Sequence, residues 1–159
     1  MHGLMMDNPL LISSIVEHAD INFQDREIVS VVGDGSLHRY TYGDCFKRVR
    51  KLANALAKLG LSEGDRVATM AWNDYRHLEA YYAIGGAGYV CHTINPRLFP
   101  EQIVFMINHA EDKWIMIDPL FIPLIEKIAP QISDVEGYIV MGDENSIVNT
   151  NLDNVISYE

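Results

Sequence analysis

The sequence has few of the features that mark specialised protein classes. Its only two cysteines, Cys45 and Cys91, form neither a CxxC pair nor a metal-ligand spacing. No apolar run approaches the length of about 18 residues needed to span a bilayer. The N-terminus lacks the basic start and long apolar stretch of a secretory signal. We therefore expect a cytoplasmic protein with reduced cysteines, no transmembrane segment and no metal site.

Positive charge is also scarce in this chain. Twelve Lys and Arg stand against 22 Asp and Glu, which gives a net charge of −10 with neutral histidines. Such a chain lacks the clustered cations that bind nucleic acid, so no nucleic-acid partner is expected. The 159 residues, 48% of them hydrophobic, are enough for one domain with a substantial core.

Two segments precede the main body of the predicted fold. Apolar residues recur at helical spacing from Ile12 to Phe23, which predicts a helix within an N-terminal segment, 1–24. In the next segment, 25–65, two β-rich runs flank Asp34-Gly35. This pattern predicts a β-hairpin with a tight primed turn, because Asp and Gly tolerate the positive φ that such a turn requires.

A second helix is expected to follow the hairpin. Thr41 resembles an N-cap residue, with Asp44 three positions later as in a capping box. Apolar residues then keep helical spacing over 46–59, and Gly60 is placed to end the helix. This helix also carries five of the twelve cations, and we interpret them as a solvated face.

From Arg66 onward, short apolar runs alternate with helical patterns. Strands are predicted at 67–72, 89–93, 114–118 and 137–141, and helices at 74–87, 100–110 and 119–128. Apolar strands separated by helices are typical of a parallel sheet covered on both faces. The fold class is therefore α/β, with a doubly wound, mostly parallel sheet over 66–142.

The last segment, 143–159, is expected to hold a loop and the start of a helix. Residues 143–151 are polar and rich in Asn, whereas Leu152, Val155, Ile156 and Tyr158 fit a helical pattern. A chain that stops inside a helix is expected to be a piece of a longer protein.

Motifs for nucleotide or nucleophile chemistry are not found. Gly33-x-Gly35 lacks the third glycine of a dinucleotide fingerprint and is followed by a β-rich run. No P-loop and no nucleophile elbow can be built. His77 and Glu79 lie two positions apart and are expected on different sides of a helix, and His109 is expected to cap a helix end. His92 ends a predicted strand, where ligands of open α/β sheets bind.

Three stretches together resemble the AMP-forming acyl-CoA synthetases. The first runs from Thr41-Tyr42-Gly43-Asp44 to Gly64-Asp65-Arg66-Val67-Ala68, the second from Arg76 to Leu98, and the third is Asn108-His109-Ala110-Glu111-Asp112-Lys113. Over about 25–159 the sequence is similar to the medium- and long-chain fatty-acid-CoA ligase branch of this family. The whole chain, 1–159, is thus read as one unit, the N-terminal portion of a larger adenylate-forming domain.

The resemblance implies a two-step reaction of a fatty acid, ATP with Mg²⁺, and coenzyme A. It also implies a homodimer, since the branch commonly dimerises through its N-terminal region. The family's phosphate loop and its catalytic lysine are absent from this sequence. No catalytic, cofactor-binding or metal residue is therefore assigned, and the chain alone is expected to be inactive and to bind no cofactor. His92, Asn95 and Arg97 fall in a family-typical stretch and are candidate substrate-binding residues.

Two alternatives remain open from the residues alone. One is a non-catalytic binding or interaction module with a flavodoxin-like fold. The other is a fragment of a different adenylating enzyme, similar to luciferase or to an aryl-acid ligase.

Overall fold

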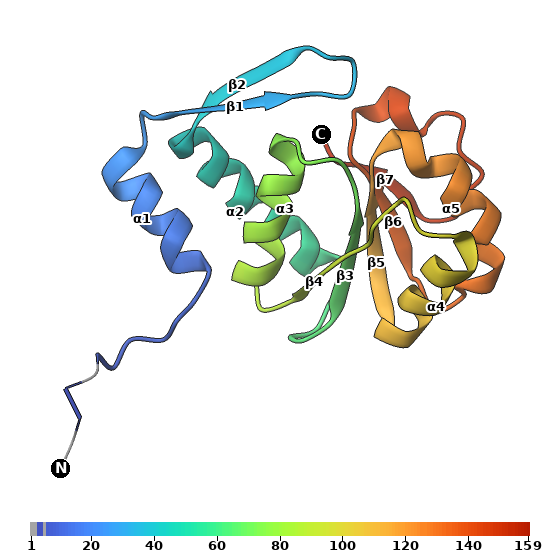
Figure 1. Ribbon diagram of the computed structural model, residues 1–159, viewed down its shortest axis with the longest axis horizontal. Coiled ribbons are helices and arrows are strands. Elements are labelled where there is room, and N and C mark those ends of the chain that lie inside the picture. The colour runs from blue at the N-terminus through green and yellow to red at the C-terminus, as the bar shows by residue number, and fades with distance from the viewer. Residues whose placement is uncertain (1–2, 5) are drawn as a thin grey trace.

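The computed structural model describes residues 3–4 and 6–159. Residues 1, 2 and 5, which belong to the predicted segment 1–24, lie outside the described residues. The chain begins with helix α1 (Ser13–Phe23) and the antiparallel hairpin of β1 (Glu27–Val31) and β2 (Leu37–Thr41), as the sequence predicted. Figure 1 shows the hairpin extending over one end of the helices.

The hairpin turn differs from the predicted one. The strands are joined by the five residues 32–36, in which Gly35 N–H donates to Val32 O at 2.8 Å and Val32 N–H donates to Ser36 O at 2.9 Å. Gly35 alone in this loop has a positive φ, +83°. The prediction of a tight primed turn was wrong, because the chain forms a longer loop that needs a left-handed residue at only one position, Gly35.

Helix α2 (Tyr42–Lys58) begins and ends where the sequence indicated. The Thr41 hydroxyl accepts the N–H of Asp44 at 3.2 Å, which satisfies one free donor of the first turn. Past the other end, Gly60 adopts φ +84°, the left-handed conformation typical of a C-terminal cap.

The main body is one parallel sheet with helices on both faces. Its strands are β3 (Arg66–Met70), β4 (Val90–Thr93), β5 (Asp112–Ile117), β6 (Gly137–Val140) and β7 (Val155–Ser157), in the spatial order β4-β3-β5-β6-β7. The helices between them are α3 (Tyr75–Gly86), α4 (Pro100–Ala110) and α5 (Ile122–Ile128). Short 3-10 turns lie at Pro119–Phe121, Ala129–Gln131 and Glu144–Ile147. The predicted doubly wound α/β class is confirmed.

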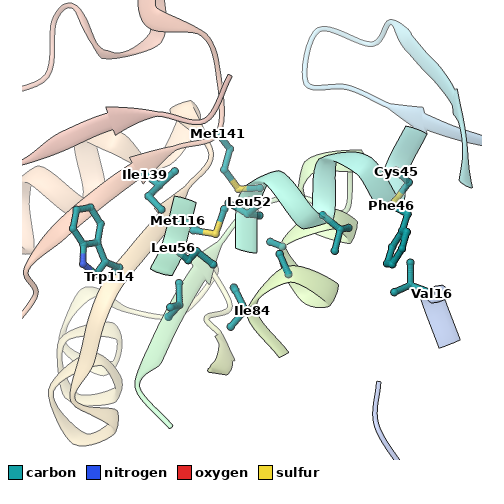
Figure 2. Packing of buried hydrophobic residues seen from close by; sticks show 14 residues of the cluster. Val16, Cys45, Phe46, Leu52, Leu56, Ile84, Trp114, Met116, Ile139 and Met141 are labelled. Atoms are coloured by element: carbon teal, nitrogen blue, oxygen red, sulfur yellow. The ribbon is translucent and has the colours of Figure 1, made fainter. Parts of the chain in front are cut away.

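Two hydrophobic clusters cover the two faces of the sheet. On one face α2 and α3 pack against the sheet, and Figure 2 shows Leu52 and Leu56 of α2 beside Met116 and Ile139 of the strands. On the other face α4 and α5 form a second cluster (Figure 1). Strand β6 is buried along its whole length, as expected for a strand covered on both sides.

The prediction of a helix start within 143–159 was wrong, because this segment ends in strand β7. Its residues pair with β6 from Tyr138↔Val155 to Val140↔Ser157. Asn154 has φ +51°, which interrupts any helix across this position. The free edge of β6 supplies backbone partners, and this tertiary pairing outweighs the helical spacing of the apolar side chains.

Candidate functional site

A cleft of about 860 Å³ lies at the carboxyl ends of the strands. The chain runs from β3 outward to β4 and then returns to β5 on the other side of β3, so the strand order reverses between β3 and β5. Ligands of open α/β sheets bind at such a switch point. The loops after β3, β5 and β6, the hairpin and the start of α3 form the walls of this switch-point cleft.

The carboxylate of Glu159 lines the switch-point cleft and accepts four hydrogen bonds from three residues. Arg48 of α2 donates from Nη1 and Nη2 at 3.1 and 3.2 Å, Arg76 from Nε at 3.2 Å, and the Tyr75 hydroxyl at 3.0 Å. Burial acts to raise the pKa of Glu159, but these donors outweigh it and hold the pKa below its ordinary value. One carboxylate thus ties the segment after β7 to α2 and α3.

A second carboxylate beneath it, Glu79 of α3, has no solvent exposure. Arg48 Nε donates to both of its oxygens, at 2.9 and 3.0 Å, and the Tyr158 hydroxyl donates to Oε2. Burial raises the pKa of Tyr158, and the charge of Glu79 adds to this effect. For Arg48, burial acts to lower the pKa, but Glu79 and Glu159 outweigh it. Arg48 therefore stays charged between two carboxylates.

Aromatic rings form the apolar walls of the switch-point cleft. The rings of His38 and Tyr75 are stacked with centroids 3.7 Å apart, so β2 packs directly on the start of α3. Burial raises the pKa of Tyr75 to about 12. Trp72 also lines the cleft, and its ring lies 5.4 Å from the ring of Phe121 behind it. A cleft with aromatic walls and a charged edge can hold a ligand that has an apolar and a polar part.

Two aspartates of the switch-point cleft accept hydrogen bonds from the turns that directly follow them. Asp118 accepts the N–H of Leu120 at 3.0 Å, and Asp143 accepts the N–H and hydroxyl of Ser146 at 3.2 and 3.1 Å. Within residues 3–4 and 6–159, no three His, Cys, Asp or Glu side chains are grouped to hold a metal.

Of the three candidate substrate-binding residues, His92 lies apart from the other two. Its Nδ1 pairs with Asp112, at 2.8 Å from Oδ2, and Asp112 is only 1% exposed. Burial raises the pKa of Asp112, while His92 opposes this effect. The pair joins β4 to the start of β5, two residues before the predicted start of that strand.

Asn95 and Arg97 lie together in the turn after β4. The Asn95 side chain accepts the backbone N–H of Arg97 at 3.0 Å, and the Arg97 guanidinium lies 5.9 Å from the ring centroid of Trp72. Both line a small crevice between the ends of β3 and β4, and His92 is not among the residues lining it. The structure therefore separates the three candidates into a pair and a single residue.

The sequence reasoning missed the charge network around Arg48. This residue was assigned to a solvated helix face, whereas its side chain is 32% exposed and pairs with a fully buried partner. His77 and Glu79 do point differently, as expected: His77 Nε2 lies 3.0 Å from the Thr69 hydroxyl of β3, and Glu79 faces α2. The sequence signal for a buried ion pair was Glu79, a carboxylate within the apolar pattern of α3.

None of the helices in the described part of the chain has the length and apolar character that a bilayer crossing requires.

The prediction that His109 caps a helix end is confirmed only for its position. His109 lies in the last turn of α4, where its ring stacks on Phe105 at 5.4 Å. Its imidazole thus covers an exposed aromatic side chain of the same helix.

Comparisons with known proteins agree with the fold and with the resemblance. The chain is 49% identical over its whole length to the medium-chain-fatty-acid–CoA ligase of Ectopseudomonas oleovorans and covers 29% of that protein. It is 50% identical over 91% of its length to the 3-methylmercaptopropionyl-CoA ligase of Ruegeria lacuscaerulensis, of which it covers 27%. The chain thus spans less than a third of the length of these relatives.

The solved structures give the same fold at lower identity. Coronafacic acid ligase from Pectobacterium brasiliense superposes with a TM-score of 0.77 over 92% of this chain and 28% of that one, at 17% identity. The family model described as AMP-binding enzyme matches residues 16–155, which is most of the chain. The chain therefore belongs to the AMP-binding enzyme family, with acyl-CoA ligases as its relatives.

Proposed function

We propose that the chain is the N-terminal portion of an AMP-forming fatty-acyl-CoA synthetase of the medium- and long-chain branch. The observation that carries the proposal is 49% identity to a medium-chain-fatty-acid–CoA ligase along all 159 residues. A long-chain-fatty-acid–CoA ligase from Thermus thermophilus is 44% identical over 88% of the chain. Relatives of this kind favour fatty-acid activation over a luciferase-like or aryl-acid activity and over a non-catalytic module.

The proposed reaction has two steps. A carboxylate oxygen of the fatty acid attacks the α-phosphorus of ATP, and pyrophosphate leaves; Mg²⁺, when bound, would stabilise the negative charge of the phosphates. The thiolate of coenzyme A, formed by loss of the thiol proton, then attacks the acyl carbon, and AMP leaves. The residues of this chain have a structural role in the proposed reaction and do not react themselves. The Arg48–Glu79 pair fixes α2 against α3 below the switch-point cleft. The aromatic walls keep one side of that cleft apolar.

We propose further that the 159-residue chain alone neither adenylates nor forms a thioester and holds none of these cofactors. The sequence contains no glycine-rich loop ending in Pro-Lys-Gly, the phosphate loop that the resemblance implies for the whole enzyme. Acyl-CoA formation by the purified chain from ATP, coenzyme A and octanoate would contradict this part of the proposal.

A chimera tests whether the chain belongs to a fatty-acid-activating enzyme. Residues 1–159 replace the aligned segment of the Ectopseudomonas oleovorans ligase, and octanoate-dependent pyrophosphate release is measured. We expect activity within about tenfold of the parent ligase, since half of the aligned positions are identical and the folds agree. A chimera with the parent's unfolding midpoint and no activity would refute the proposal. A matched control carries Glu79→Leu, which removes the buried carboxylate and should lower the unfolding midpoint.

We also propose a cytoplasmic homodimer. Both cysteines are free, in keeping with a reducing compartment. Large apolar side chains on and before α1 are strongly exposed, among them Leu10 at 104%, Ile15 at 59% and Ile21 at 77%. Apolar surface of this extent is typical of a contact region. Light scattering is expected to give the mass of a dimer, and a monomer at high concentration would remove the dimer proposal.

A further inference from the structure

Helix α2 differs in charge from the rest of the molecule. It carries five of the twelve Lys and Arg of the chain and only one acidic residue, Asp44. The next acidic residue along the chain is Glu63, so the residues between the two contain no carboxylate side chain that could offset the cations. Outside α2, the chain holds seven cations against 21 acidic residues. Helix α2 is thus a basic element in an acidic chain.

Three lysines form a row along the outer side of α2. Lys47, Lys51 and Lys58 are exposed and follow one another after four and seven positions, a spacing that returns to the same side of a helix. At a rise of 1.5 Å per residue, this lysine row spans about 16 Å. Ala55 is exposed between Lys51 and Lys58, so no bulky side chain interrupts the row there.

The charges of the lysine row are largely available to a partner. Within the described residues, Lys51 and Lys58 take part in no ion pair. Lys47 lies 3.4 Å from the carboxylate of Asp44, but both side chains of this pair are more than half exposed. An exposed pair of this kind contributes little to stability, so a partner can replace Asp44 at small cost.

A crevice of about 230 Å³ adjoins the lysine row. It is lined by Arg48, Lys51, Leu52, Ala55, Tyr158 and Glu159. Arg48 and Glu159 are paired with each other, so they leave no net charge in the crevice. The side chains of Leu52 and Ala55 offer apolar contact directly beside Lys51. The surface therefore combines a row of cations with a small apolar recess.

We propose that the lysine row of α2 docks an acidic helix of another protein. Carboxylates placed three or four positions apart on such a helix repeat along one side, as the lysines do, so the two rows are complementary in charge. An apolar side chain between those carboxylates can enter the crevice beside Lys51. The inference concerns an interaction surface and does not depend on acyl-CoA chemistry.

An anionic membrane suits this row less well than a helix does. A helix that lies on a bilayer buries its apolar side in the lipid. The apolar side of α2 is already buried in the protein core, where Figure 2 shows Leu52 and Leu56 beside the strands. A bilayer would also approach the acidic residues that dominate the rest of the chain, whereas a helix contacts the row alone.

Synthetic peptides test the proposal on the 159-residue chain. The probe is an acetylated peptide of Ala-Ala-Ala-Glu repeats, in which Ala favours the helix. One control peptide has Gln in place of every Glu, and a second keeps every Glu but has Pro within two repeats, which breaks the helix. In ¹H–¹⁵N spectra at low salt, we expect saturable shifts of the α2 amides with the probe and binding at least tenfold weaker with either control. Equal binding of a control peptide, or shifts spread over the whole chain, would overturn the proposal.

Two double variants separate the lysine row from general charge effects. Lys51→Gln/Lys58→Gln removes two exposed charges of the row and should weaken binding of the probe at least fivefold, with the unfolding midpoint unchanged. Arg39→Gln/Lys127→Gln removes an equal charge from exposed positions on the hairpin and on α5, and should leave binding within twofold. Equal weakening in both variants, or no binding by the unsubstituted chain, would overturn the proposal. Tighter binding to phosphatidylglycerol vesicles than to the probe, lost in Lys51→Gln/Lys58→Gln, would overturn it in favour of a membrane.

Discussion

Removal of the Arg48 guanidinium is expected to destabilise this fold more than removal of any exposed ion pair. Glu79 has no solvent exposure and receives two hydrogen bonds from Arg48 Nε. In Arg48→Met the carboxylate keeps only the Tyr158 hydroxyl as a partner. Breaking a buried pair by removing one partner costs about 3–5 kcal/mol. The Arg48 side chain is 32% exposed, so water reaches the site and the lower end of this range, about 3 kcal/mol, is expected.

Urea unfolding followed by circular dichroism measures this loss directly. For a domain of this size, about 3 kcal/mol corresponds to a decrease in Tm of roughly 6–12 °C. The matched control is Arg39→Met, which breaks the pair with Glu27 whose side chains are 53% and 52% exposed. That exposed pair should contribute about 0–1 kcal/mol. The slope of the unfolding free energy against urea should be the same in both variants.

The double variant Arg48→Met/Glu79→Leu separates a buried charge from lost packing. With the carboxylate replaced by an apolar side chain, no uncompensated charge stays in the core, so most of the stability should return. The reasoning is refuted if Arg48→Met costs no more than Arg39→Met. It is refuted also if the double variant is as unstable as Arg48→Met alone.

Three further perturbations test other parts of the fold. Burial lowers the pKa of His77 below its ordinary value of 6.5, so the unfolded chain binds the proton more readily. Stability should therefore fall as pH decreases below about 6.5, by at most about 1.4 kcal/mol per pH unit, and His77→Gln should flatten this slope in urea titrations from pH 7.5 to 5.5. Gly137→Ala places a Cβ 2.5 Å from the Trp114 ring and should cost about 1–3 kcal/mol in unfolding free energy. Thr41→Ala removes the N-terminal cap of α2 and should cost about 1 kcal/mol in the same assay.

Local sequence signals were sufficient for most elements of the fold. The cap at Thr41 and the left-handed Gly60 bracket α2 within a few residues, because both act through backbone groups of their own turn. The apolar strands β5 and β6 were identified because a strand covered on both faces has no polar alternation. Such signals require no knowledge of the tertiary partner.

The elements that were missed depend on partners distant in the sequence. Arg48 and Glu79 are 31 residues apart, and neither helix pattern indicates which face of α2 meets α3. Strand β7 was predicted as a helix because its apolar spacing fits both structures. Only the unpaired edge of β6, which becomes visible once the sheet is assembled, decides between them.

Part of the arrangement of the three candidate substrate-binding residues could have been predicted from the strand pattern of β4. Side chains of a strand point alternately to opposite faces, so His92 and Thr93 at the end of β4 must separate. In the structure His92 pairs with Asp112, whereas Thr93 lines the small crevice that holds Asn95 and Arg97. The alternation thus places His92 and Thr93 on opposite faces of the sheet. What the sequence does not supply is the ring of Trp72 beneath the guanidinium, because that contact requires β3 and β4 to lie side by side.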